Sequence, residues 1–231
     1  MPSEPIVAAD LDELARRAAA WMAEEVTQAV ARRRGCSLAL SGGSTPRPAY
    51  ERLAAQPAVP WEAVEIYFGD ERAVPPSDPA SNYRMAGEAL LDRVGLPEGR
   101  VHRMEADDRD LEAAAARYAA LLPDRLDVLV LGMGPDGHTA SLFPHSPALR
   151  ETEKRVVPAT SPVPPLHRLT ITPPVIAAAR RVAVITAGAS KAPVVAEVLR
   201  GPWRPEALPA QLAREGTWII DRAAAAGLAP R

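Results

Sequence analysis

The chain has too little cysteine for a disulfide framework. Cys36 is the single cysteine among its 231 residues, so neither an intrachain disulfide nor a cysteine-rich metal site is possible. Because Cys36 directly precedes an apolar stretch, we expect it to be a small buried residue.

An excess of charge of one sign is also missing. The 27 basic and 29 acidic side chains give a net charge of −2, which provides no reason to expect nucleic acid or an anionic membrane surface as a partner. No apolar run approaches the length of a membrane span, and residues 1–9 lack the basic and apolar segments of a signal peptide. We therefore expect a cytoplasmic protein.

What remains is an ordinary globular composition, with 47% hydrophobic and 24% charged residues. The length allows one large core or two small ones. No internal repeat is evident, and the proline-rich segments 75–79, 158–165 and 202–209 are short enough to be loops. The sequence therefore predicts a single domain over residues 1–231.

Strand-like and helix-like segments alternate along the chain. Strands are expected at 37–40, 64–68, 126–131, 155–157, 169–172, 182–185 and 217–220. Helices are expected from Asp10 to Gly35 and over 46–55, 82–94, 110–122 and 192–199, with short helices after Pro173 and Asp221. This alternation predicts an α/β fold with a mostly parallel, Rossmann-like sheet covered on both faces.

The glycine-rich loop 132–143 follows the apolar strand 126–131. In open α/β sheets, ligands bind at the carboxyl ends of the strands, where this loop would lie. The loop carries Asp136 and His138, a pair suited to proton transfer near neutral pH. Metal ligation by the same two residues is the alternative, but the sequence offers no third ligand.

A second loop of this kind, residues 41–45, joins a strand to a helix. Gly42 and Gly43 would let a ligand approach the backbone, Ser44 and Thr45 add hydroxyl donors, and helix N-terminal N–H groups favour anions. The loop matches neither a Walker A sequence nor the dinucleotide fingerprint. A capped turn, with Thr45 as N-cap and Pro46 at the first helical position, is the simpler interpretation.

Charged residues lie at further strand ends. Residues 69–72 form either a solvated loop or a site in which Asp70 or Glu71 acts as acid or base and Arg72 binds an anion. Lys191 lies near the start of a helix, where a cation opposes the helix dipole, so either it meets an anion or it is a surface residue. Arg168 opens a strand. His102, His145 and His167 have no motif around them and are not assigned to the site.

Four segments, taken in order, resemble one family. They read Ser-Gly-Gly-Ser-Thr-Pro at 41–46, Gly-Asp-Glu-Arg-Ala-Val-Pro at 69–75 with Ser81-Asn82, Gly-Pro-Asp-Gly-His-Thr-Ala-Ser-Leu-Phe-Pro at 134–144, and Arg-Leu-Thr-Ile-Thr-Pro-Pro at 168–174 followed by Gly188 and Lys191-Ala192. They are similar to the 6-phosphogluconolactonases, which share a family with the glucosamine-6-phosphate isomerases. The resemblance implies a three-layer α/β/α sandwich. It also implies hydrolysis of 6-phospho-D-glucono-1,5-lactone in the pentose phosphate pathway, without a cofactor. Because the sequence offers a single cysteine and no third ligand beside Asp136 and His138, we also expect no metal.

The resemblance also assigns roles to individual residues. It implies that His138 is the catalytic acid/base, that Asp136 is its neighbour, and that Asp70 and Arg72 line the sugar end. The residues implied to surround the substrate, mainly its phosphate, are Gly42, Gly43, Ser44, Thr45, Arg168 and Lys191. His145 departs from the family pattern, which often has glycine after Phe-Pro. We expect a sugar-phosphate lactone as the small-molecule partner and make no prediction about the oligomeric state.

Two alternatives remain within the same fold. A glucosamine-6-phosphate deaminase typically has Asn before the Asp of its Asp-Gly-His loop and Phe-Asn-Glu-Pro after it, whereas this chain has Pro135 and Leu142-Phe143-Pro144-His145. A non-catalytic sugar-phosphate sensor usually carries a DNA-binding domain, for which 231 residues leave little room.

Overall fold

Six parallel strands form the central sheet of the computed structural model, which describes residues 4–228. In sheet order these strands are β1 (Ile6–Ala8), β9 (Thr217–Asp221), β8 (Arg181–Thr186), β5 (Val128–Leu131), β2 (Cys36–Leu40) and β3 (Val64–Phe68). Every residue of β2 and β5 is buried, as expected for strands covered on both faces. The predicted domain 1–231 also includes residues 1–3 and 229–231, which lie outside the described residues.

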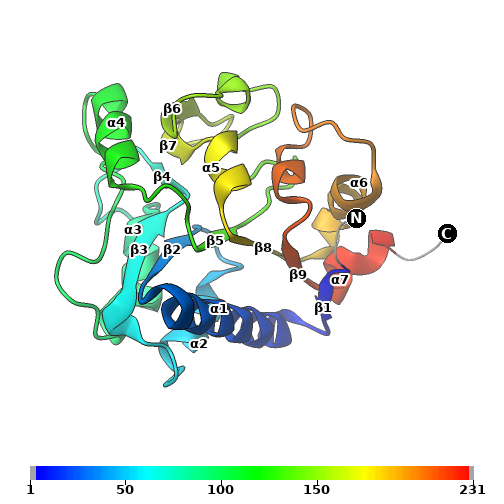
Figure 1. Cartoon of the computed structure of the whole chain (residues 1–231). Helices are drawn as coiled ribbons and strands as arrows, with labels where there is room; N and C mark the ends of the chain where they lie inside the picture. Colours follow the sequence, from blue (N-terminus) through cyan, green and yellow to red (C-terminus); the bar gives the residue numbers. More distant parts are fainter. Residues whose placement is uncertain (1–3, 229–231) are drawn as a thin grey trace.

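Helices cover both faces of this sheet. They are α1 (Leu11–Arg33), α2 (Arg47–Ala54), α3 (Asn82–Ala89), α4 (Leu111–Leu121), α5 (Pro173–Ala178), α6 (Ala192–Arg200) and α7 (Arg222–Ala225). In Figure 1, α1 and α2 lie below the sheet, and α4 and α5 lie above it. The predicted α/β fold with a parallel sheet between helical layers is therefore confirmed. No helix in residues 4–228 is both long and apolar enough to cross a membrane.

The hydrophobic core lies between the sheet and these helices. On α1, the side chains of Leu14, Ala18, Met22 and Val26 are fully buried, at the helical spacing that the sequence shows. Cys36, the single cysteine, is buried at the start of β2, as predicted.

A second, antiparallel sheet corrects one prediction. Residues 69–72 were expected to be a loop, but Asp70–Arg72 form strand β4, which pairs with β7 (His167–Ile171). Strand β6 (Val156–Thr160) completes this sheet, whose order is β4-β7-β6. Strands were predicted at 155–157 and 169–172, close to β6 and β7. Strand β4 is not evident from local sequence, because its three residues are all charged and its partner β7 lies about a hundred positions further along the chain. The pairing fixes Asp70 and Arg72 as part of a strand rather than a solvated loop.

Some element boundaries also differ from the predictions. Asp10 caps α1 as expected, since its carboxylate accepts the Glu13 N–H at 2.9 Å. However, the left-handed residue that ends the helix is Arg34, with φ of +62°, and not Gly35. Thr45 is not an N-cap, because α2 starts at Arg47 and follows Pro46.

The periodicity of the sequence did not predict where α3 ends, nor that strand β1 exists. Helix α3 ends at Ala89 and is followed by a 3-10 turn over Leu91–Arg93, whereas one helix was predicted over 82–94. Strand β1 was not predicted because it has three residues and lies at the edge of the sheet, beside β9.

Candidate active site

A cavity of about 380 Å³ lies at the carboxyl edge of the parallel sheet. Loops that follow β2, β5 and β8 surround it, together with β4 and β7. Of the ten residues that the sequence analysis assigned to a site, all but Asp136 line this cavity: Gly42, Gly43, Ser44, Thr45, Asp70, Arg72, His138, Arg168 and Lys191. The topology thus brings together four segments that are far apart in the sequence, at the edge where such folds bind ligands.

Asp136 lies behind His138 rather than in the cavity wall. Its Oδ1 atom is 2.6 Å from Nδ1 of the imidazole, and it also accepts the backbone N–H of His138 at 3.2 Å. Burial opposes ionisation of this carboxyl, but the hydrogen bonds and charge of His138 outweigh it and hold the pKa of Asp136 below its usual value. A carboxylate on Nδ1 favours the tautomer whose proton is on that nitrogen, which leaves the Nε2 lone pair available.

The backbone around His138 is arranged to make room for this pair. A Cβ atom at Gly134 would lie 2.1 Å from both Nδ1 and Cε1 of His138, so a residue with a side chain would displace the imidazole. The Gly134 N–H donates to the His138 carbonyl at 2.9 Å, and the Thr139 hydroxyl donates to the Gly132 carbonyl at 2.8 Å. These bonds close the loop on itself and fix the direction of the histidine.

The loop between β2 and α2 presents its backbone to the cavity. Gly43 has φ of +109°, which favours glycine, and a Cβ atom at Gly42 would lie 1.7 Å from Oδ1 of Asn82. Within residues 4–228, none of the backbone N–H groups of residues 42–45 donates a hydrogen bond. These unpaired donors at the start of a helix suit an anionic group in the cavity.

Asp70 is a buried carboxylate that belongs to a hydrogen-bonded network. Its Oδ2 atom accepts the Ser141 hydroxyl at 2.6 Å, and Oδ1 accepts Nδ2 of Asn82 at 3.1 Å. Asp70 is only 7% exposed. The network joins the end of β3 and β4 to the histidine loop and to the first residue of α3.

Glu71, the alternative acid or base, does not line the cavity. Its carboxylate accepts three backbone N–H groups, those of Arg72, Asn82 and Tyr83, and the Ser81 hydroxyl. Burial raises the pKa of Glu71 although these four donors oppose the shift. This side chain therefore ties β4 to the start of α3, and we assign it a structural role.

Three cations face the cavity, and Asp70 is the one carboxylate among its lining residues in the described part of the chain. Arg168 is 7% exposed, and its guanidinium donates to the Pro165 carbonyl at 3.0 Å and to the Ser161 hydroxyl at 3.3 Å. Burial lowers the pKa of Arg168. Burial also lowers the pKa of Lys191, which the Asp136 carboxylate partly opposes. The excess of cations over carboxylates in this lining favours an anionic ligand.

Arg72 is positioned by its own strand and by the following loop. Its Nη1 atom donates to the Ala80 carbonyl, whereas its buried Nε atom has no hydrogen-bond partner in the described part of the chain. A buried donor without a partner is costly unless a ligand or water satisfies it.

Several residues that shape the site were not assigned to it from the sequence. Asn82 lines the cavity, while Ser141 and Ser161 hold Asp70 and Arg168 from outside it. Asn82 and Ser141 belong to the quoted motifs, which was the available signal; Ser161 carries none. His145 lies outside the cavity with φ of +61°, a conformation that glycine adopts without strain.

The fold and the cavity define an α/β protein with a histidine–aspartate pair and a cation-rich pocket at the carboxyl edge of a parallel sheet. The chain belongs to the family described as glucosamine-6-phosphate isomerases/6-phosphogluconolactonase, whose sequence model matches residues 9–220.

Individual relatives agree with this assignment. The chain is 39% identical to a 6-phosphogluconolactonase of Synechocystis sp. over 230 residues, covering 94% of this chain and 95% of the relative. It is similar to the solved 6-phosphogluconolactonase of Trypanosoma brucei, with a TM-score of 0.85 and 31% identity over 98% of this chain and 99% of that one. A monomeric glucosamine-6-phosphate deaminase, at 23% identity, gives a TM-score of 0.85 over 97% of this chain and 100% of the other, which shows the shared fold alone.

Proposed function

We propose that the protein hydrolyses 6-phospho-D-glucono-1,5-lactone to 6-phospho-D-gluconate, with His138 as general acid and base. The observation that carries the proposal is the held imidazole: Asp136 occupies Nδ1 at 2.6 Å, and the ring lines a cavity rich in cations. Its relatives named 6-phosphogluconolactonase support the substrate. The continuous hydrophobic core supports a single domain.

The chemistry that we assign to His138 has two steps. Nε2 takes a proton from water as the water oxygen attacks the lactone carbonyl carbon. The resulting imidazolium then gives a proton to the ring oxygen as the carbon–oxygen bond breaks. Asp136 stabilises the imidazolium and holds the ring in one orientation, as a carboxylate partner of a catalytic histidine generally does.

We assign the remaining residues to substrate binding. The N–H groups of residues 42–45, with Arg168 and Lys191, are suited to the phosphate, because they combine unpaired backbone donors with two cations that line the same cavity. Asp70 would accept a sugar hydroxyl only by sharing oxygens that Ser141 and Asn82 already occupy. We assign Arg72 to stabilise the negative charge that develops on the carbonyl oxygen during attack, since its buried Nε atom has no hydrogen-bond partner within residues 4–228.

The glucosamine-6-phosphate deaminase alternative has the same fold but less support from the residues. Leu142-Phe143-Pro144-His145 stands where the deaminases typically carry Phe-Asn-Glu-Pro, so the glutamate is missing. A sensor that binds a sugar phosphate without catalysis does not need an acid–base pair such as His138 and Asp136. Release of acid from the lactone, measured beside release of ammonia from glucosamine 6-phosphate, separates the two enzymes.

The direct test of the mechanism is His138→Ala, assayed on freshly made lactone with spontaneous hydrolysis subtracted. General acid–base catalysis typically contributes about 10² to 10⁴-fold, and we expect a loss of that order in kcat with the fold retained. His145→Asn is the matched control, because His145 lies outside the cavity and Asn tolerates its left-handed backbone. Activity of His138→Ala within a factor of about three of the parent would remove His138 from the mechanism.

A further inference from the structure

A second cavity lies at the opposite, amino-terminal edge of the parallel sheet, and its volume is about 480 Å³. Arg33 ends α1 shortly before β2, Arg125 precedes β5, and Arg180 directly precedes β8. The cavity is lined by Glu24, Glu25, Gln28, Ala29, Arg32, Arg33, Arg125, Arg180 and Arg181. None of these residues belongs to the candidate active site, which lies at the other end of the same strands.

Asp127, which is buried and does not line this cavity, holds two of its arginines. Its Oδ1 atom is 2.7 Å from Nε of Arg33 and 3.3 Å from Nε of Arg180. Its Oδ2 atom is occupied by the backbone N–H and hydroxyl of Ser37, at 3.0 and 3.1 Å. One carboxylate therefore brings two guanidinium groups together, and their terminal nitrogens donate no hydrogen bond within residues 4–228.

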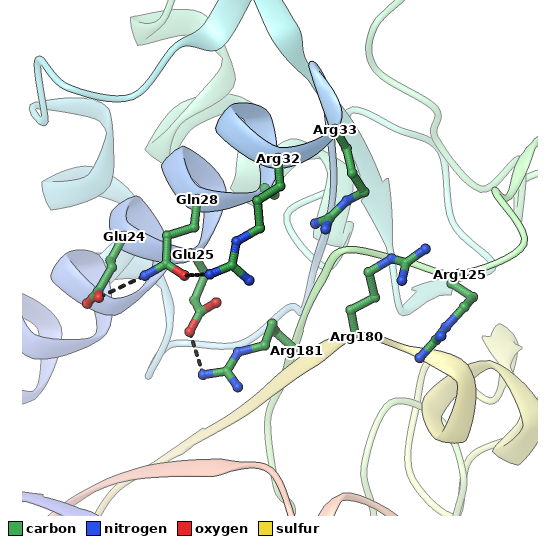
Figure 2. Close-up of a pocket in the computed structure, with 9 residues that line it drawn as sticks. Glu24, Glu25, Gln28, Arg32, Arg33, Arg125, Arg180 and Arg181 are labelled. Carbon is green, nitrogen blue, oxygen red and sulfur yellow. Dashed lines mark hydrogen bonds and ion pairs between the residues drawn. The ribbon is translucent and has the colours of Figure 1, made fainter.

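Arg125 is also held at its Nε atom, although by a backbone carbonyl rather than a carboxylate. Its Nε donates to the Ala178 carbonyl at 2.7 Å, and it forms no ion pair within the described part of the chain. In Figure 2, no dashed line joins Arg33, Arg125 or Arg180 to another drawn residue, whereas Glu25 contacts Arg181, and Gln28 contacts Glu24 and Arg32. Three guanidinium groups are thus fixed at their Nε ends, with their terminal donors available.

The remaining charges of the cavity do not neutralise this group. Five arginines face Glu24 and Glu25, and Glu25 is already paired with Arg181 at 2.6 Å. Even with Asp127 counted, the formal charge is +2, on a chain whose net charge is −2. Close cations of this kind repel one another unless an anion lies between them.

The lining also restricts the chemistry of the occupant. Ala29 is the one apolar residue among those that line the cavity, and no aromatic side chain is present in that lining to stack on a base. Planar guanidinium groups with paired terminal N–H donors match phosphate oxygens bidentately. Arg33, Arg125 and Arg180 also border a neighbouring hollow, which Arg100 lines as well, with Glu65, Asp124 and Asp127. The residues that line that hollow have a formal charge of +1, against +3 for those that line the first cavity. The side facing α1 is therefore where an anion fits.

We propose that this cavity binds a small anion with two or more phosphate groups and no large apolar part. The site is separate from the proposed lactonase site and does not depend on it. Its essential donors are the terminal nitrogens of Arg33, Arg125 and Arg180, which Asp127 and the Ala178 carbonyl hold in position.

The test is calorimetric titration with inorganic pyrophosphate at fixed ionic strength, in a Lys191→Ala background that weakens the phosphate site of the other cavity. The double variant Arg33→Gln/Arg180→Gln is expected to lose at least about tenfold in affinity. Arg125→Gln is a second variant that disturbs the protein less, because within residues 4–228 the Arg125 guanidinium makes one hydrogen bond, to the Ala178 carbonyl. Circular dichroism and the thermal midpoint establish that each variant is folded.

Arg109→Gln is the matched control, since Arg109 is an exposed arginine outside the cavity. It should leave the affinity unchanged. An equal loss in Arg109→Gln would reduce the effect to overall charge and overturn the proposal. Unchanged affinity for pyrophosphate in both cavity variants would also overturn the proposal. Citrate binding as tightly as pyrophosphate would overturn it too, because the cavity would then not select for phosphate.

Discussion

At the scale of single residues, the histidine loop is determined by what surrounds each position. Gly134 is required by the neighbouring imidazole, because its missing side chain leaves the space that His138 and Asp136 occupy. The motif 134–144 predicted that Asp136 and His138 act as a pair on a glycine-rich loop. The motif did not indicate that Gly134 is needed because it lacks a side chain, since that depends on how the loop folds back on itself.

Gly134→Ala should therefore lower kcat by about 10²-fold or more, since the imidazole must leave its position and a misplaced acid/base loses most of its contribution. The measurement is lactone hydrolysis beside a thermal unfolding curve. Gly87→Ala is the matched control, because the nearest atom to a Cβ there is 3.7 Å away. If Gly134→Ala keeps the activity of Gly87→Ala, the position of His138 is not critical.

The charge on Lys191 should make ligand binding depend on pH. Burial lowers its pKa, so its positive charge is lost at a lower pH than for an ordinary lysine. The second pKa of a phosphate ester is about 6, so the ligand charge is constant above neutral pH. Binding of 6-phosphogluconate should then weaken as pH rises through the lowered pKa of Lys191.

Lys191→Arg supplies the control, because arginine stays charged over this range. Its affinity for 6-phosphogluconate, measured calorimetrically from neutral to alkaline pH, should fall less than that of the parent. Lys191→Ala should bind weakly throughout and raise KM more than it lowers kcat, as expected for a phosphate contact remote from the reacting carbon. Parallel pH profiles for the parent and the arginine variant would contradict the assignment.

At the scale of elements, strands with an apolar pattern of their own were predictable, whereas the three-residue strands β1 and β4 were not. The prediction for 64–68 matches β3 in full, because four of its five residues, all except Glu65, have buried apolar or aromatic side chains that carry their own signal. By contrast, Asp70–Arg72 become a strand only through pairing with β7. Ser141 and Asn82 are similar, since their importance comes from Asp70, a residue in another element.

One contact between elements should have a measurable effect on stability. Tyr118 on α4 is buried, and its hydroxyl accepts the Phe68 N–H at 2.7 Å and donates to the Phe68 carbonyl at 3.1 Å. Tyr118→Phe leaves both backbone groups of β3 without this partner. We expect the free energy of unfolding to fall by about 1–3 kcal/mol, measured by urea denaturation.

Tyr83→Phe is the control for the loss of a hydroxyl, because the Tyr83 hydroxyl makes no hydrogen bond in the described part of the chain, although its ring packs on Phe68. It should change stability by less than about 0.5 kcal/mol. A change of the same size in both variants would show that the bonds to Phe68 contribute little.

At the scale of the whole molecule, the topology separates two cationic regions that the net charge conceals. Strands β5 and β8 each carry site residues after their carboxyl ends and arginines before their amino ends. The four motifs were enough to predict the first region because a parallel sheet brings its carboxyl ends together. The arginine cavity has no motif, and its residues become neighbours only when α1, β5 and β8 are in place.

Hydrolysis at this site should not depend on a metal ion. Within residues 4–228 no group of three or more His, Cys, Asp or Glu side chains is placed to hold an ion, and Asp136 and His138 bond to each other. A catalytic zinc needs three protein ligands to generate a metal-bound hydroxide. Lactonase activity should therefore survive prolonged EDTA treatment and desalting, and should fall at acid pH, since an imidazolium cannot deprotonate water. Loss of activity on chelation that added Zn²⁺ restores would instead make Asp136 and His138 metal ligands.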